Sequence, residues 1–438
     1  MLLTPLDLRG VAAAELAARL PAPAPEKAFP TAEVRSVLDA VRDGGDAAVR
    51  ELTARFDGVD VTELRVEPER LVEARRAVAP ELLGALTLAY DRIVAYHGHE
   101  PAPLPDFVSG GVTVRHLVRP VRRAGLYAPG GRARYPSTVL MTAAPARVAG
   151  VDEIALCVPP GPDGSVAPET LAAAAVAGID EVYRIGGAQA VAAMAFGTET
   201  VSPVDVIAGP GNRYVAEAKR QVAGIVGVPS AFTGPSEVVV VADDTTPVAW
   251  AAIDVVVQAE HGPDGLAWLV TWSPGLAQAV AAAVDDIVAR SPRRADLEAT
   301  LTGGGYAVVV DGPAEALAVA NAVAPEHLEL LVDGADALLP LVRCAGAVFL
   351  GPGAPASVGD YVAGPNHVLP TARTARFASA LRPDDFRTHI HAVSLDAGAL
   401  AGLGPAVVAL AGAEGLPAHA ESVRLRLDGA LRPSAEVP

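Results

Sequence analysis

A glutamate and a histidine stand side by side in the stretch APEHLEL at residues 324–330. Pro325 suits the first turn of a helix, so we expect Glu326 and His327 near a helix N-terminus. There the dipole favours a carboxylate and disfavours an imidazolium, which helps both side chains act as bases. Because neighbours on a helix diverge by roughly 100°, they suit two separate proton transfers better than one relay. The alternative is an ordinary helix cap.

The same dipeptide occurs once more, in the stretch QAEHGPD that ends an apolar helix. Here Gln258 and His261 are three residues apart and therefore share a helix face. Histidine is the commonest metal-ligand side chain, and a glutamine can offer its carbonyl oxygen, so this pair could hold a metal ion. The alternative is a helix C-terminus that Gly262 caps, with His261 favourably placed in the dipole.

Other candidate side chains lie in polar segments further along the chain. Asp360 and His367 belong to the stretch ASVGDYVAGPNHVLPT, directly after an apolar run expected to be a strand. Ligand sites of α/β proteins form at the carboxyl ends of strands, so both residues are candidates. His419 lies in the stretch EGLPAHAES near the C-terminus. The alternatives are a turn-forming aspartate, a loop histidine and a surface histidine.

Three glycine-rich segments could receive a nucleotide. They are AGLYAPGGRARYPSTVLM, VYRIGGAQ and IAGPGNRY. Glycines let backbone N–H groups approach a phosphate at a helix N-terminus. Singly, each segment could be a surface loop or a tight turn, and Asn212 could be a plain N-cap. Together the three make a nucleotide cofactor more plausible than any one of them does.

Short apolar runs rich in β-branched residues predict the strands that must position these side chains. They lie at 153–160, 181–187, 204–211, 237–243, 266–272, 306–312, 328–332 and 346–351. Helical stretches separate many of them, at 168–177, 188–196, 212–223, 275–290 and 313–323. Strands buried on both faces that alternate with helices indicate parallel α/β sheets. Outside this region we expect helices at 31–56, 67–97 and 397–428, and a strand at 111–121.

The pattern predicts an α/β protein with two Rossmann-like, mostly parallel-sheet domains in series and helical arms at both ends. The expected divisions are 1–27 for the N-terminal arm, 28–235 for the domain with the glycine-rich loops, 236–380 for the domain with the candidate metal and acid–base residues, and 381–438 for the C-terminal arm.

Composition narrows the class of partner. The formal net charge of −17 argues against nucleic-acid binding, which needs a basic surface. No stretch approaches the apolar length that crosses a bilayer, and the N-terminus is a poor signal peptide. The two cysteines, Cys157 and Cys344, suggest reduced core residues rather than a disulfide framework. We therefore expect a cytoplasmic protein with a small-molecule partner.

Taken together, the motifs resemble the histidinol dehydrogenase family, from about residue 25 to the end. The stretches that carry the resemblance, in the family's order, are LYAPGGRARYPSTVLM, IGGAQAVAAMAFGT, GPGNRYVAEAKRQV, GPSEVVVVAD, QAEHGPD, APEHLEL, VGDYVAGPNHVLPT and EGLPAHAESV. The resemblance implies oxidation of L-histidinol to L-histidine through L-histidinaldehyde, with two hydride transfers to NAD, as the last chemistry of histidine biosynthesis. It also implies a homodimer whose C-terminal arms cross over.

The resemblance assigns roles to particular residues. It implies one Zn²⁺ per subunit on Gln258, His261, Asp360 and His419, with His419 supplied by the partner chain. It implies that Glu326 and His327 are the bases. Substrate contacts are implied for the zinc ligands and for Ser236, His327, His367 and Glu414. Cofactor contacts are implied for Tyr127, Gln189 and Asn212.

Some positions depart from the family's pattern. Ala356 stands where the family usually has Glu, the stretch 376–388 replaces a more usual Ser-Gly-Leu-Ser, and AFTGPSE lacks an earlier acidic residue. The nearest rival reading is a relative that oxidises another small polar alcohol. A zinc hydrolase, with Glu326 activating a metal-bound water, is a rival from another class, and an inactive binding protein is a third. The glycine-rich loops and the absence of a His-Glu-x-x-His motif argue against the hydrolase.

Overall fold

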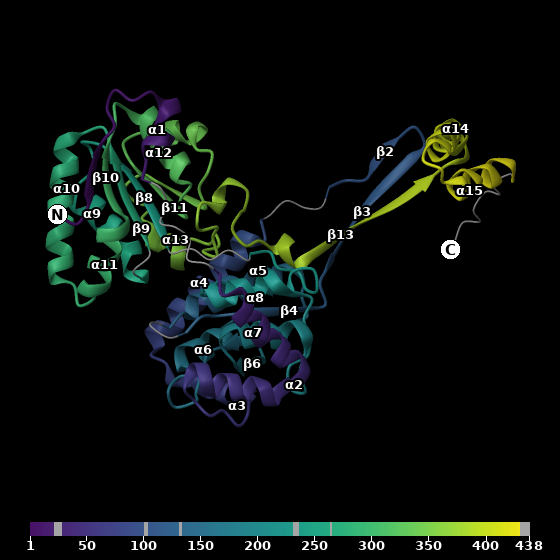
Figure 1. Cartoon of the computed structure of the whole chain (residues 1–438), viewed down its shortest axis with the longest axis horizontal. Coiled ribbons are helices and arrows are strands. Elements are labelled where there is room, and N and C mark those ends of the chain that lie inside the picture. The colour runs from purple at the N-terminus through teal and green to yellow at the C-terminus, as the bar shows by residue number, and fades with distance from the viewer. Residues whose placement is uncertain (22–28, 100–103, 131–133, 231–235, 263–264, 430–438) are drawn as a thin grey trace. The chain divides into compact units, whose positions relative to one another are not determined.

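The computed structural model describes residues 1–21, 29–99, 104–130, 134–230, 236–262 and 265–429, with the side chain of His261 outside this part. The chain forms two compact units (Figure 1). The larger comprises Met1–His99 and Val121–Phe386, and the smaller comprises Glu100–Pro120 and Arg387–Pro438. The expected α/β class is confirmed, since the larger unit contains two parallel sheets with helices on both faces.

The first sheet of the larger unit has four parallel strands in the order β6-β5-β4-β7. Its strands are β4 (Arg123–Tyr127), β5 (Glu153–Val158), β6 (Glu181–Arg184) and β7 (Val206–Ala208). The helices around it are α2 (Thr31–Asp57), α3 (Pro68–Ala77), α4 (Pro80–His97), α5 (Pro136–Ala149), α6 (Pro168–Val176), α7 (Gly187–Phe196) and α8 (Arg213–Val222).

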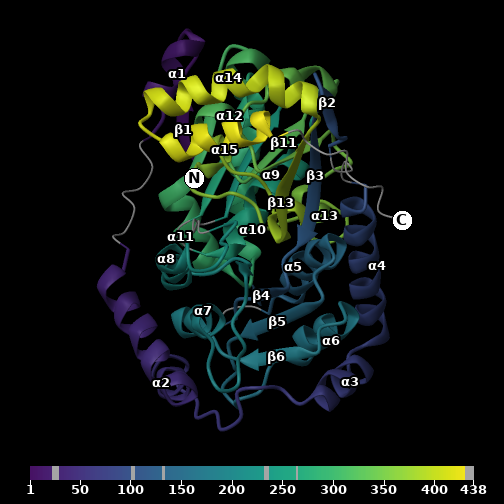
Figure 2. The same ribbon diagram turned by 90° about the vertical axis from the view of Figure 1, so that its right-hand side faces the viewer.

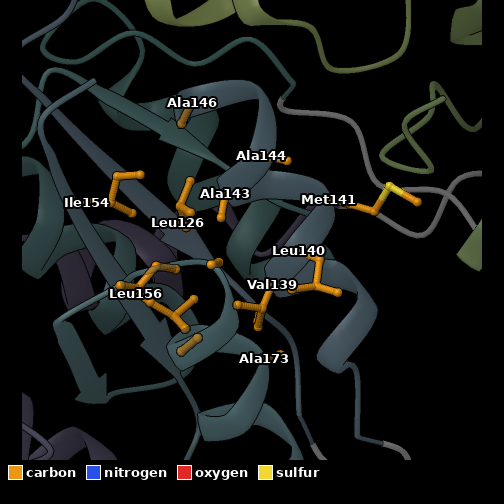
Figure 3. Packing of buried hydrophobic residues seen from close by; sticks show 14 of the residues in the cluster. Leu126, Val139, Leu140, Met141, Ala143, Ala144, Ala146, Ile154, Leu156 and Ala173 are labelled. Carbon is orange, nitrogen blue, oxygen red and sulfur yellow. The ribbon is translucent and has the colours of Figure 1, made fainter. Parts of the chain in front are cut away.

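Alternate residues of these strands pack into two cores, one on each face. Figure 3 shows the first core, where Val139 and Ala143 of α5 gather with Leu126, Ile154 and Leu156 of β4 and β5. On the other face, strand residues such as Ala155 and Cys157 pack with α2, α7 and α8. Both faces are thus covered, which leaves the ends of the strands as the places where polar side chains can gather.

The second sheet has six parallel strands in the order β1-β10-β9-β8-β11-β12. Its strands are β1 (Thr4–Asp7), β8 (Glu237–Ala242), β9 (Leu266–Thr271), β10 (Gly305–Val309), β11 (His327–Leu331) and β12 (Ala347–Leu350). Its α-helices are α1 (Ala13–Arg19), α9 (Val248–Val257), α10 (Pro274–Arg290), α11 (Arg294–Gly304), α12 (Pro313–Val323) and α13 (Ala356–Tyr361). Short 3-10 helices are η1 (Gln258–His261), η2 (Ala335–Leu341), η3 (Thr374–Arg376) and η4 (Pro383–Phe386).

The strands at the middle of this sheet are buried from end to end. Every residue of β8 and of β11 is buried. Val238 and Val240 pack with α9, α10 and α11 on one face, whereas Val239 and Val241 pack with α1 and α12 on the other (Figure 1). Polar side chains on these two strands therefore have to find partners inside the protein.

The smaller unit combines an antiparallel sheet with two helices. Its strands are β2 (Phe107–Ser109), β3 (Val112–Pro120) and β13 (Arg387–Leu395), in the order β13-β3-β2. Helices α14 (Ala397–Ala413) and α15 (Pro417–Asp428) pack side by side (Figure 2). Large apolar side chains are exposed on this unit, among them Val108, Val393, Leu410 and Leu425.

Two expectations about the chain are corrected by the sheets. Residues 1–20 are not simply a helical arm, because Thr4–Asp7 form β1 and pair with β10 at the edge of the second sheet. The helix start expected at Pro325 is wrong, because β11 begins at His327 and pairs with β8 and β12. The strand expected at 328–332 is confirmed. Within the described residues, no helix is long and apolar enough to span a membrane.

Candidate active site

Glu326 and His327 lie at the amino end of β11, directly after the Ala324–Pro325 connection from α12. The main chain pairs β11 with β8 on one side and β12 on the other, which overrides the tendency of Pro325 to begin a helix. Glu326 and His327 are 8 and 3% exposed. Oε2 of Glu326 is 3.6 Å from Nδ1 of His327, so the divergence expected on a helix is also wrong.

Backbone and carboxylate groups fix the orientation of this pair. The backbone N–H of Glu237, the first residue of β8, donates to Oε2 of Glu326 at 3.1 Å. Nδ1 of His327 donates to the carbonyl oxygen of Glu237 at 3.2 Å, since a carbonyl can only accept. Nε2 of His327 lies 3.1 Å from Oδ1 of Asp360, and the ring stacks on Phe349. The imidazole is thus held with Nε2 facing a carboxylate.

Burial and neighbouring charges shift the proton affinities of these groups. Burial raises the pKa of Glu326 to about 7, against the opposing effect of His327. Burial disfavours the charged imidazole, but the carboxylates of Glu326 and Asp360 outweigh it and raise the pKa of His327 to about 9. Burial, and then the charge of Glu326, raise the pKa of Glu237 to about 8. Groups with such values can exchange protons near neutral pH.

Asp360 and His367 reach this cluster from α13 and the loop that follows it. Asp360 comes after β12 in the sequence, but its carboxylate contacts His327 at the amino end of β11. The expectation of a site at the carboxyl end of β12 is therefore wrong. Nδ1 of His367 donates to the carbonyl oxygen of Asp360 at 2.8 Å, and its Nε2 lies 3.4 Å from Oγ1 of Thr138 on α5. The structure thus brings Glu326, His327, Asp360 and His367 together.

Gln258 supplies the observation that fits a metal ion. It caps α9, is 1% exposed, and neither its amide oxygen nor its amide nitrogen has a hydrogen-bond partner. An unpartnered buried amide is costly, so such a group is ready for a ligand. A carboxamide oxygen, a carboxylate and imidazoles form a mixed donor set that suits Zn²⁺. The residues present therefore fit the expected ion.

The two histidines of the expected metal set do not lie within the described part of the larger unit. His261 belongs to η1, but its side chain lies outside the described residues. His419 is exposed in the first turn of α15 in the smaller unit, and Glu414, also exposed, ends α14. Consistently, no three His, Cys, Asp or Glu side chains of the described chain gather as a metal site. The zinc ligand set stays a prediction.

Tyr127, Gln189 and Asn212 line one cleft beside the first sheet. The cleft has a volume of about 1670 Å³. The backbone N–H of Gly187 donates to the hydroxyl of Tyr127 at 3.2 Å, and Asn212 caps α8 through the N–H groups of Tyr214 and Val215. The three expected cofactor residues are therefore brought together.

Polar groups in the cleft remain available to a ligand. Nε2 of Gln189 lies 3.4 Å from Oδ2 of Asp57, whose pKa burial raises to about 6, whereas the buried Oε1 of Gln189 has no partner. Drug-sized ligands occupy clefts of roughly 300–1,000 Å³, so this cleft has room for a dinucleotide. A large cleft with an unpartnered amide oxygen fits the nicotinamide cofactor that the resemblance implies.

Ser236 and two further residues complete the description of the site. Ser236 immediately precedes β8 and accepts the backbone N–H of Leu266 through its carbonyl oxygen, at 3.1 Å.

Sequence reasoning missed Glu237 and Thr138, which contact Glu326 and His367. A glutamate at the head of the apolar run EVVVVAD could have signalled Glu237, because a charge in a buried strand needs a function or a partner. Nothing in the sequence marks Thr138.

The fold and the site define a class: a two-sheet α/β enzyme with a buried acid–base cluster on one sheet and an open polar cleft beside the other. The sequence matches the histidinol dehydrogenase family over residues 23–427. It is 48% identical over 398 residues to the histidinol dehydrogenase of Synechococcus sp., covering 90% of this chain and 92% of that protein. The identity to the Rhizobium meliloti histidinol dehydrogenase is 48% over 401 residues, covering 91 and 92%.

A solved structure agrees with these relatives. The crystal structure of the histidinol dehydrogenase from Elizabethkingia anophelis superposes with a TM-score of 0.92 at 33% identity and covers 98% of each chain. The chain therefore belongs to the histidinol dehydrogenase family, and it is an oxidoreductase of that family.

Proposed function

We propose that this protein oxidises L-histidinol to L-histidine through L-histidinaldehyde, in the last steps of histidine biosynthesis in the cytoplasm. The observation that carries the proposal is the buried cluster of Glu326, His327 and Asp360. The buried, unpartnered amide of Gln258 at the end of α9 supports it. Zn²⁺ on Gln258, His261, Asp360 and the partner's His419 would supply a cation that anchors the imidazole and amine of the substrate. NAD in the cleft of Tyr127, Gln189 and Asn212 would accept the hydride.

His327 acts as the base in the first oxidation. As the hydride leaves carbon, Nε2 of His327 takes the hydroxyl proton and a carbonyl forms. Its Nδ1–H bond to the carbonyl oxygen of Glu237 holds the ring in the tautomer that leaves Nε2 for this task. Asp360 now pairs with Nε2 and raises the pKa of His327. A cation held by the Asp360 carboxylate would weaken this pairing and leave Nε2 of His327 to act as the base.

Glu326 acts in the step between the two oxidations. Its carboxylate takes a proton from water, whose oxygen adds to the aldehyde carbon, while His327 returns its proton to the carbonyl oxygen. The product is the hydrate, and His327 is again a base. A pKa of about 7 suits this exchange at neutral pH. His327 then takes a proton from the hydrate as the second hydride leaves, which yields the carboxylic acid. Ser236, His367 and Glu414 are proposed to contact the substrate.

The primary test counts reduced cofactor per substrate. Purified protein is incubated with Zn²⁺, excess NAD⁺ and a limiting amount of histidinol. Two NADH per histidinol support the proposal. No reduction with histidinol, but turnover of another small polar alcohol, would favour a relative with a different substrate. Metal-dependent hydrolysis without cofactor reduction would favour the zinc hydrolase.

A second test separates the roles of the two bases. Glu326→Gln should retain oxidation of the alcohol better than His327→Gln does, because Glu326 is assigned to hydration. Single-turnover NADH formation from histidinol and from histidinaldehyde measures the two half-reactions. Equal loss of both half-reactions in the two variants would contradict the division of roles.

A third test addresses the homodimer and His419. The exposed apolar side chains of β13, α14 and α15, among them Val393, Leu410 and Leu425, support a partner-covered surface on the smaller unit. A heterodimer of one His327→Gln chain and one His419→Ala chain should retain about half of the wild-type activity, because one of its two sites is intact if His419 crosses over. Both homodimers should be inactive. An inactive heterodimer would assign His419 to its own chain's site, and an active His419→Ala homodimer would show that the site does not need His419.

A further inference from the structure

Glu329 contacts α13 from the strand that carries His327. It is two residues after His327 on β11, so both side chains lie on the same face of the sheet. Glu329 is 1% exposed, and its Oε1 accepts the backbone N–H of Ala356, the first residue of α13, at 3.0 Å. Asp360 lies four residues further along this helix and therefore on the same side. β11 thus holds α13 at two points, Glu329 to Ala356 and His327 to Asp360.

Glu329 also contacts α9, through a second acid. The carboxyl group of Asp254, 8% exposed, lies against that of Glu329. Burial raises the pKa of both groups, and the hydrogen bond between them raises the pKa of Glu329 further while it opposes the rise for Asp254. Gln258 lies four residues after Asp254, where α9 passes into η1 with helical backbone angles, so Asp254 and Gln258 share a helix face. Ala356 lies one helical turn before Asp360, and Asp254 lies one helical turn before Gln258. Both residues that Glu329 contacts therefore lie next to a residue of the proposed metal set.

The protonation of the pair agrees with this bridging geometry. Burial, and then the neighbouring Asp254, raise the pKa of Glu329, so that it is a neutral acid at neutral pH. A neutral acid can donate its proton to Asp254 while it accepts the N–H of Ala356. A glutamine offers the same donor and acceptor, whereas a leucine of similar size offers neither.

We propose that Glu329 is a positioning residue that joins α9 to α13 and thereby sets the spacing of Gln258 and Asp360 around His327. The inference rests on the proposed function, because it assumes that Gln258 and Asp360 hold the zinc ion. Outer-shell residues of this kind typically affect metal affinity or activity by about 10–100-fold when they are removed.

The experiment compares Glu329→Leu with Glu329→Gln in the full-length protein. Zinc affinity of the metal-free protein is measured by competition with a chelating dye, and kcat and KM are measured with histidinol. We expect Glu329→Leu to weaken zinc binding and lower kcat by about 10–100-fold. Glu329→Gln should stay within about threefold of wild type, since it keeps both hydrogen bonds. Binding of ADP-ribose to the cleft on the first sheet should be unchanged in both.

Asp254→Ala keeps the test decisive if Glu329→Leu does not fold. Alanine favours the helix and removes only the link to α9, so zinc affinity should fall by about 3–10-fold. Wild-type zinc affinity in Glu329→Leu or in Asp254→Ala would overturn the inference, as would a Glu329→Gln variant that fails as severely as Glu329→Leu. A wild-type protein that binds no zinc would instead overturn the proposed function, and this inference with it.

Discussion

The two parallel sheets of the larger unit present polar side chains at opposite ends of their strands. In the first sheet, Tyr127 ends β4 and Gln189 and Asn212 follow β6 and β7, so they lie at the carboxyl ends. This is where α/β folds usually bind ligands. In the second sheet, Ser236 precedes β8, and Glu326 and His327 stand at the start of β11. The acid–base cluster therefore lies at the amino ends.

The polar ends of the two sheets differ in their exposure to solvent as well as in the end of the strands at which they lie. The carboxyl ends of the first sheet lead into glycine-rich turns and helix starts that line an open cleft, which suits a ligand that enters and leaves. The amino ends of the second sheet are closed, and Glu237, Glu326 and His327 are all less than 9% exposed. Closure is what raises the pKa of both glutamates toward neutrality. The open cleft therefore suits exchange of a ligand, and the closed cluster suits transfer of protons.

The largest effect is expected from His327→Gln. Loss of the proposed base should lower kcat by about 10³-fold, because general bases contribute roughly 10²–10⁴-fold. Binding of NAD⁺ to the cleft, measured by calorimetry, should stay within about twofold, since the residue belongs to the other sheet. His99→Gln, exposed two residues after the end of α4, is the matched control and should leave kcat unchanged. A parallel loss of NAD⁺ affinity would show that the two sheets do not work separately.

A large effect on stability is expected from Gly209→Ala, in the turn after β7. Gly209 has a φ of +113°, and an added Cβ would lie 2.1 Å from the carbonyl oxygen of Tyr127. The free energy of unfolding should fall by about 3 kcal/mol from strain and overpacking. Gly178→Ala, with a φ of +67° and open space around it, should cost only about 1 kcal/mol. Urea denaturation measures both costs, and equal costs would mean that the backbone of Tyr127 moves easily to make room for the added Cβ.

Glu237→Gln should change how stability depends on pH. The pKa of Glu237 is about 8 in the folded protein and near its ordinary value in the unfolded chain, so the folded state holds the proton more tightly. In the wild-type protein, Glu237 adds to the free energy of unfolding in full when the pH is below the pKa of the unfolded chain. This contribution is lost as the pH rises through about 8, the pKa in the folded protein.

The free energy of unfolding of Glu237→Gln, taken relative to wild type, should therefore rise by roughly 1–3 kcal/mol between pH 5 and pH 8. Denaturation of the metal-free protein at both pH values gives the difference. Glu69→Gln, on exposed α3, should show almost no change. If the difference in free energy of unfolding between Glu237→Gln and wild type did not change with pH, the folded protein would not hold a proton on Glu237 more tightly than the unfolded chain does.

The smallest effect is expected from Gln189→Ala in the open cleft. Loss of one amide contact should raise KM for NAD⁺ by about 5–10-fold, with kcat within about twofold, since a hydrogen bond contributes roughly 0.5–1.5 kcal/mol. Steady-state kinetics measure both constants. Gln278→Ala, exposed on α10, is the control. A fall in kcat without a change in KM would place Gln189 in the chemistry rather than in cofactor binding.

Sequence patterns predicted most of the framework. The β-branched runs marked β5 to β12, because strands buried on both faces need continuous apolar sequence. β4 and α5 were missed, since the glycine-rich stretch 124–141 resembles a loop. The helix expected at 67–97 is two helices, α3 and α4, separated at Val78 and Ala79. β1, a four-residue edge strand, was missed because its partner lies far along the chain.

The candidate site was predictable in its residue types but not in its contacts. The sequence identified Asp360 and His327 separately, and only the fold shows that α13 brings one to the other. Glu329 escaped notice because an acid between leucines looks like the solvent-facing position of a half-exposed strand. β11 is covered on both faces, so that acid had to find a partner inside. The roles assigned to these residues stay predictions.

The pairing of β1 with β10 has a consequence for how the chain is made. Thr4 is the register partner of Tyr306, roughly 300 residues later. At about 5–20 residues per second, β1 waits on the order of 15–60 s on the ribosome before its partner strand exists. The strands of the first sheet, by contrast, all lie within residues 123–208 and are therefore synthesised close together in time. During synthesis the cleft beside the first sheet can therefore form first, while Leu3, buried in the finished protein, stays in solvent or on a chaperone until the second sheet closes.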